Sequence, residues 1–169
     1  MTKFFYISLL LGLIIYLIVL GYIYFFQRNL LYHPSVNGYQ NDEANFDYVE
    51  VLIQNNEGIK LKAWLHEKDL INKKTILFFH GNAGNLANRN YKLNDLSKFD
   101  VNFLIVAFRG FSNNHGKPTE KGLYEDAKSS LDWLKLKGVK EKNLILYGES
   151  LGTAVAIETA QNKNLAGII

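Results

Sequence analysis

The chain has 169 residues, of which 48% are hydrophobic, and its formal net charge at pH 7 is +3. That length accommodates one globular domain, and the charge is too small and too dispersed to indicate a nucleic acid partner. The chain has no cysteine, which excludes disulfides and thiol catalysis. It also has no glycine-rich nucleotide-binding motif and no histidines at metal-ligand spacing, so we expect no cofactor and no metal site.

The N-terminal segment from Phe4 to Phe26 contains no charged residue and is flanked by Lys3 and Arg28. As an α-helix, its roughly 23 residues would span about 34 Å, enough to cross the hydrocarbon core of a bilayer. A cleaved signal peptide is one alternative, but the apolar stretch is too long and no small-residue cleavage site follows. A buried helix of a globular domain is another. The sequence favours a single-pass membrane anchor at residues 1–28, and its orientation stays open because the flanking charges nearly balance.

Residues 29–45 are mostly polar and contain Pro34 and Gly38, which indicates a juxtamembrane linker. Its apolar residues at 30–32 could rest on the bilayer surface or cover the domain, and the sequence favours neither. We expect the domain itself to occupy residues 46–169.

A β-hairpin opens this domain. Apolar and polar residues alternate over 49–53 and again over 59–66, on either side of a turn at 55–58. From residue 75 the pattern changes to alternating strands and helices. The expected elements are strands at 75–79, 101–107 and 143–147, and helices at 118–138 and 153–158. Such alternation predicts an α/β fold, with a mostly parallel sheet, helices on both faces, and ligands at the carboxyl ends of the strands.

The strand expected at 75–79 leads into His80-Gly81-Asn82-Ala83-Gly84-Asn85. Small residues here let the backbone fold closely over a ligand, and Asn85 is a candidate N-cap for the next helix. In acyl transfer, the Asn82 N–H could be one of two donors to the oxyanion, worth about 3–4 kcal/mol. The alternative is that the glycines only form a tight turn. His80 could be a general base, but its place in the chain favours a role in shaping the loop.

Arg109, with Gly110, follows the strand expected at 101–107. It could hold loops together through hydrogen bonds to carbonyl groups, or it could face an anionic part of a substrate. We favour the structural role.

The most informative motif is Gly148-Glu149-Ser150-Leu151-Gly152, between a predicted strand and a predicted helix. A G-x-S-x-G pattern in this setting is typical of a nucleophile elbow, a strained turn with glycines where side chains would clash. Ser150 is then the candidate nucleophile, and the Leu151 N–H is the second oxyanion donor. We expect the Glu149 side chain to point away from the hydroxyl. The alternative is a glycine-flanked turn whose serine caps the helix.

These motifs together resemble the alpha/beta-hydrolase superfamily. Within it they are similar to membrane-anchored serine hydrolases related to yeast bud-emergence hydrolases, animal alpha/beta-hydrolase-domain depalmitoylases and serine aminopeptidase-like proteins. The matching stretches lie, in order, at 28–35, 80–85, 108–111, 116–127 and 148–152. One departure is Ser112-Asn113-Asn114, where the family has a Gly-Lys-Ser-like stretch, and we expect it to alter a loop.

The resemblance also implies three more strands, an acid and a histidine beyond residue 169. No His and no Asp follows Ser150, so the order nucleophile, acid, base is not completed here. The apolar run at 165–169 looks like the start of the next strand. We therefore expect the chain to be C-terminally truncated, and its hydrolase domain to be incomplete.

The predicted function is that of a serine hydrolase that cleaves an ester, thioester or amide through an acyl-enzyme. A membrane-anchored site favours the acyl chains of lipids or lipidated proteins, and a small-ester or aminopeptidase-like specificity stays open. Two other classes remain. The chain could be an inactive, membrane-anchored fragment or pseudoenzyme that binds partners through an open sheet edge. It could also be a single-pass interaction module whose hydrolase-like fold only binds ligands.

Overall fold

The structure, a computed structural model, describes residues 2–35 and 44–169. It divides into two units, Met1–His33 and Pro34–Ile169. The predicted linker at 29–45 lies partly outside the described residues, and Gly38 is among those left out.

The first unit is a single helix, α1 (Thr2–Leu31). The helix has 30 residues, most of them apolar, so by length and composition it can cross a membrane. The helix continues past residue 28, where the sequence places the end of the anchor, to Leu31.

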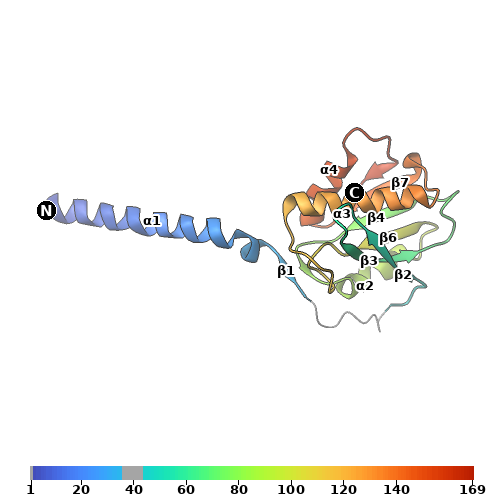
Figure 1. Ribbon diagram of the computed structural model, residues 1–169, viewed down its shortest axis with the longest axis horizontal. Helices are drawn as coiled ribbons and strands as arrows, with labels where there is room; N and C mark the ends of the chain where they lie inside the picture. The colour runs from blue at the N-terminus through green and yellow to red at the C-terminus, as the bar shows by residue number, and fades with distance from the viewer. Residues whose placement is uncertain (1, 36–43) are drawn as a thin grey trace. The chain divides into compact units, whose positions relative to one another are not determined.

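The second unit is built on a six-stranded sheet in the order β2-β3-β6-β4-β7-β8 (Figure 1). These strands are β2 (Val49–Gln54), β3 (Lys60–His66), β4 (Thr75–Phe79), β6 (Asn102–Val106), β7 (Leu144–Gly148) and β8 (Gly167–Ile168). β2 and β3 form the predicted antiparallel hairpin, β3 pairs antiparallel with β6, and the remaining pairs are parallel. A separate two-stranded sheet consists of β1 (His33–Pro34) and β5 (Ala83–Gly84). The predicted mostly parallel sheet is confirmed.

The hairpin turn is held by the side chain of Asn55. Its Oδ1 accepts hydrogen bonds from the N–H groups of Glu57 at 3.0 Å and Ile59 at 2.9 Å. Gly58 has φ +79°, a conformation that favours glycine. The polar turn residues therefore fix the register in which β2 pairs with β3.

In the described part of the second unit, three helices cover the sheet: α2 (Asn90–Leu96), α3 (Glu120–Leu136) and α4 (Leu151–Ala160). Short 3₁₀ turns, η1 (Ala87–Arg89) and η2 (Glu141–Asn143), precede α2 and β7. Right-handed crossovers require α3 and α4 to lie on one face of the sheet and α2 on the other, because β6 lies to the opposite side of β4 from β7 and β8. Figure 1 shows α3 and α4 together, with α2 across the sheet from them.

The limits of α3 follow from the sequence. Thr119 caps its start by accepting a hydrogen bond from the Gly122 N–H at 3.0 Å. Gly138, with φ +93°, follows its end, as predicted. The helix buries the predicted apolar stripe of Leu123, Ala127, Leu131 and Leu134.

The two central strands, β4 and β6, are buried along their whole length. Strands covered on both faces need continuous apolar runs, and such runs predicted these two strands. The apolar run at 165–169 contains β8, which pairs with β7 through Ile145 and Gly167, as expected for the start of another strand. The loop at 80–85 follows the carboxyl end of β4, and the turn at 148–152 lies at the carboxyl end of β7. These two strands are neighbours in the sheet.

Candidate active site

The 148–152 motif forms the turn from β7 into α4, as predicted. Ser150 has φ +52° and ψ −113°, a conformation that residues with side chains rarely adopt. Its side chain is exposed, and within the described part of the chain it makes no hydrogen bond that caps α4. This disfavours the alternative of a simple capping serine. Backbone strain at an exposed polar residue is a feature of functional sites.

The flanking glycines are explained by close packing. A Cβ on Gly152 would lie 2.1 Å from the carbonyl oxygen of Phe79, and one on Gly148 would lie 2.4 Å from the Cα of Thr153. The Glu149 N–H also donates a hydrogen bond to the Phe79 carbonyl at 2.9 Å. The turn is therefore held directly against the carboxyl end of β4.

The loop that carries Asn82 lies beside this turn. A Cβ on Gly81 would be 3.2 Å from the Glu149 Oε1 and 3.5 Å from the Glu149 carbonyl oxygen. Leu151 is the first residue of α4, where helix N–H groups have no intrahelical acceptor and favour negative charge. The structure thus brings together the segments of Asn82, Ser150 and Leu151.

His80 is buried, and backbone groups occupy both of its ring nitrogens. The Phe108 N–H donates to Nε2 at 3.2 Å, so Nε2 must accept, and Nδ1 donates to the Gly81 carbonyl at 2.7 Å. Burial, together with the positive charge of Arg89, lowers the pKa of His80 to about 4. A neutral ring committed in this way is a poor general base. The geometry favours the loop-shaping role.

Asn85 caps the helical segment that follows it, as predicted. The turn η1 begins after Leu86, whose side chain cannot accept a hydrogen bond. The Asn85 Oδ1 instead accepts from the Asn88 N–H at 3.2 Å, and the Asn88 Oδ1 accepts from the Asn85 N–H at 2.8 Å. This reciprocal pair is the hydrogen-bond pattern of a capping box, at the start of the segment that leads through η1 into α2.

The Ser112-Asn113-Asn114 stretch lies in the loop between β6 and α3. Ser112 and Asn113 have φ values of +50° and +64°. The Ser112 hydroxyl accepts from the Leu86 N–H at 3.1 Å, and the Asn114 Nδ2 donates to the Ala107 carbonyl at 2.8 Å. This loop therefore holds the segment that begins at Leu86 through a hydrogen bond to its backbone.

Glu149 forms ion pairs with two cations. Its Oε1 lies 3.3 Å from the Arg89 Nη2, and its Oε2 lies 2.8 Å from the Lys92 Nζ. Burial raises the pKa of Glu149, but the hydrogen bond from Lys92 and the charge of Arg89 outweigh it, and the pKa falls below its usual value. Arg89 and Lys92 were not predicted as partners of Glu149, because they lie 60 and 57 positions from it in the chain.

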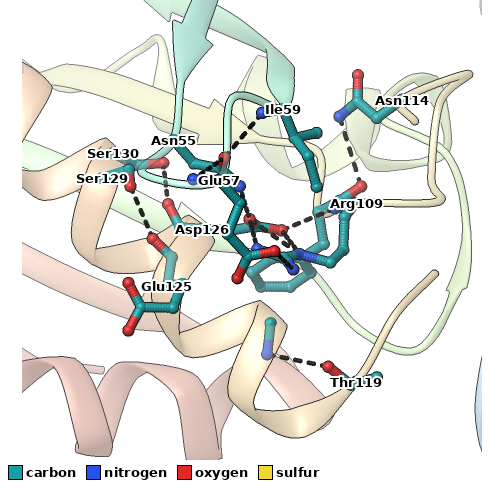
Figure 2. A network of polar contacts seen from close by, with 12 residues as sticks. Asn55, Glu57, Ile59, Arg109, Asn114, Thr119, Glu125, Asp126, Ser129 and Ser130 are labelled. Carbon is teal, nitrogen blue, oxygen red and sulfur yellow. Dashed lines mark hydrogen bonds and ion pairs between the residues drawn. The ribbon is translucent and has the colours of Figure 1, made fainter. Parts of the chain in front are cut away.

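Arg109 is part of a buried polar network (Figure 2). Its Nη2 lies 2.8 Å from the Asp126 Oδ1, and its Nη1 lies 2.8 Å from the Glu57 Oε2. The Asn55 Nδ2 also donates to Asp126, at 2.8 Å. Burial lowers the pKa of Arg109, but the hydrogen bond to Asp126 outweighs it and the pKa is raised.

The favoured structural role of Arg109 fits this network, but its expected partners were wrong. The observed partners are the carboxylates of Asp126 and Glu57, whereas we expected backbone carbonyl groups. These carboxylates bind the guanidinium, which in the alternative faced an anionic part of a substrate. Asp126 lies in the stretch at 116–127 that matches the family, but it was not predicted to bind Arg109. The sequence does contain an indication of this pair. An acid beside Ala127 lies next to the buried apolar stripe of α3, and a buried carboxylate needs a cation as its partner.

No family model matches the chain. It is 31% identical to protein bem46 of Schizosaccharomyces pombe, over 90% of this chain and 55% of that protein. It is 30% identical to the alpha/beta hydrolase domain-containing protein WAV2 of Arabidopsis thaliana, over 81% of this chain and 47% of that protein. An uncharacterized membrane protein of Saccharomyces cerevisiae is 31% identical, over 82% of this chain and 51% of its own length. The chain thus spans about half the length of the curated relatives it matches.

Solved structures agree with these relatives. An esterase of Pyrococcus furiosus superposes with a TM-score of 0.64 at 27% identity, covering 80% of this chain and 53% of the esterase. An alpha-beta hydrolase of Vibrio vulnificus gives a TM-score of 0.65 at 27% identity, covering 73% of this chain and 45% of its own. The shared fold and the matching relatives agree with the motifs found in the sequence. The chain belongs to the alpha/beta-hydrolase superfamily and is similar to bem46, WAV2 and the yeast membrane protein.

Proposed function

We propose that the full-length protein that carries this chain is a serine hydrolase, in which Ser150 attacks the carbonyl of an ester, thioester or amide. The observation that carries the proposal is the strained backbone of the exposed residue Ser150, which has φ +52° at the start of α4. The structural similarity to an esterase supports the same reaction class.

The attack converts the carbonyl into a tetrahedral oxyanion, and the N–H groups of Leu151 and Asn82 stabilise its charge. A histidine outside these 169 residues, oriented by an acid, takes the Ser150 proton and gives it to the leaving group. Water then attacks the acyl-serine, and the acid product leaves. His80 does not take this part, because its Nε2 is occupied by the Phe108 N–H.

Covalent labelling tests the proposal. A fluorophosphonate probe should label the full-length wild-type protein, and Ser150→Ala should abolish the label. Ser129→Ala is a suitable control, because its hydroxyl donates to the Glu125 carbonyl within α3 and should leave labelling intact. Label that persists in Ser150→Ala would assign the reaction to another nucleophile. A folded wild-type protein without label would favour the pseudoenzyme or interaction module.

We also propose that α1 is a single-pass membrane anchor and that the substrates are acyl chains of lipids or lipidated proteins. The length and composition of α1 and the similarity to a protein named as a membrane protein support the anchor. After alkaline carbonate extraction, the full-length protein should remain with the membranes, and a variant that lacks residues 1–31 should not. Faster turnover of short-chain than of long-chain acyl thioesters would contradict the substrate class.

A further inference from the structure

Glu149, which precedes Ser150, connects the turn at 148–152 to the segment at the start of α2. Its two carboxylate oxygens bind different cations, Arg89 and Lys92. The two differ in burial: the side chain of Arg89 is 7% exposed, whereas that of Lys92 is 26% exposed. Arg89 is therefore the partner that is fixed within the protein.

The rest of the Arg89 guanidinium holds the loop that carries Asn82. Its Nη1 donates to the Ala83 carbonyl at 2.7 Å and to the Asn85 carbonyl at 3.1 Å. Gly84 adopts φ +82°, and a Cβ there would lie 2.9 Å from the same nitrogen. The loop is thus wrapped closely around the guanidinium.

We propose that Arg89 is a positioning residue for the acyl transfer, a role that rests on the proposed function. One planar guanidinium joins the loop of Asn82 to the residue before Ser150, and so sets the separation between the N–H groups of Asn82 and Leu151. A guanidinium suits this task because its donors form a rigid fork that binds several acceptors at once. Oxyanion donors are effective when they are fixed before the charge develops, and small displacements of such groups are costly.

Lys92 provides the matched control. It binds the same carboxylate, at 2.8 Å, and its Nζ lies 5.9 Å from the Tyr147 ring centroid. In the part of the chain that the structure describes, Lys92 contacts Glu149, Tyr91 and Tyr147 but not the loop of Asn82. Removing Lys92 therefore weakens the hold on Glu149, whereas removing Arg89 also disconnects the loop from the turn.

The test compares Arg89→Met, Arg89→Lys and Lys92→Met in the full-length protein, using a short-chain p-nitrophenyl ester. We expect kcat to fall by about 10- to 100-fold in both Arg89 variants, with KM nearly unchanged, because only the transition state carries the oxyanion. Arg89→Lys should not rescue activity, since an ammonium lacks the fork. Lys92→Met should keep kcat within about threefold of wild type. An equal loss in Lys92→Met, or full activity in Arg89→Met, would overturn the proposal.

Amide hydrogen exchange separates this proposal from the proposed function. Arg89→Met should accelerate exchange in residues 81–85 without affecting β4, and Lys92→Met should not. If the wild-type protein neither reacts with the fluorophosphonate probe nor hydrolyses the ester, the proposed function fails. Unchanged exchange at 81–85 in Arg89→Met would overturn the linking role of Arg89 as well. Should Arg89→Met fail to fold, Glu149→Met removes the oxygen that accepts from Arg89 at similar side-chain volume, and unchanged kcat there would overturn the proposal.

Discussion

The carboxylate of Asp126 accepts hydrogen bonds from both the backbone and the side chain of Arg109. The Arg109 N–H lies 2.8 Å from Oδ2, and Nη2 lies 2.8 Å from Oδ1. The side chain of Asp126 is 0% exposed, and that of Arg109 is 7% exposed. This pair joins the loop after β6 to α3, and through Asn55 it also holds the turn of the β2–β3 hairpin.

Breaking this pair should destabilise the protein strongly. Asp126→Asn leaves the Arg109 charge buried without its main partner, and we expect a loss of about 3–5 kcal/mol in the free energy of unfolding. Glu57→Gln is the control, because the Glu57 side chain is 51% exposed and its pair should contribute less than about 1 kcal/mol. Urea unfolding followed by tryptophan fluorescence measures both. Similar losses in the two variants would contradict the prediction.

His80 should make stability depend on pH. Its folded-state pKa of about 4 lies below its ordinary value of 6.5, so the unfolded chain binds the proton more readily. The stabilisation is complete above pH 6.5 and is lost as the pH falls from 6.5 towards 4, by roughly 3 kcal/mol. Unfolding free energies at pH 7 and pH 4.5 should differ less in His80→Gln than in wild type. Equal pH dependence would show that His80 titrates normally.

Gly152 should not tolerate a methyl group. In Gly152→Ala the new Cβ would meet the Phe79 carbonyl, so the turn must move off β4, and we expect a loss of roughly 3 kcal/mol. Gly167→Ala is the control, since no atom lies within 4 Å of its added Cβ. Thermal unfolding compares the two. A Gly152→Ala protein as stable as the control would indicate that the turn is less tightly packed than described.

The backbone strain at Ser150 has a measurable cost. Glycine adopts φ +52° without the steric penalty of a Cβ, so Ser150→Gly should be more stable than Ser150→Ala by about 1–2 kcal/mol. Urea unfolding of the two variants gives the difference directly. If alanine is as stable as glycine, the turn relaxes without cost and the strain argument fails.

Much of the fold was predictable because its signals are local. Continuous apolar runs predicted β4 and β6, alternation predicted the β2–β3 hairpin, and Thr119 and Gly138 marked the limits of α3. These patterns depend on whether a segment is covered on one face or on both. Consecutive residues within the segment show this, because they alternate in the first case and are all apolar in the second.

The polar contacts were less predictable, because their partners are distant in the chain. Glu149 meets Arg89 across 60 positions, and Arg109 meets Asp126 across 17. No spacing rule links such pairs, since they depend on which strands become neighbours. The roles of Ser150, Asn82 and Leu151 in catalysis remain predictions, as do the substrates and partners.

The pairing of β4 with β7 has a consequence for biosynthesis. Thr75 pairs with Leu144, about seventy residues further along the chain. At about 5–20 residues per second, a ribosome needs roughly 4–14 s to synthesise that interval. Once β6 has also been made, it can pair with one edge of β4, but the opposite edge has no partner until β7 follows. Such apolar edges are sites of aggregation and chaperone binding. The turn that carries Ser150 gains its support from β4 only at the close of that interval.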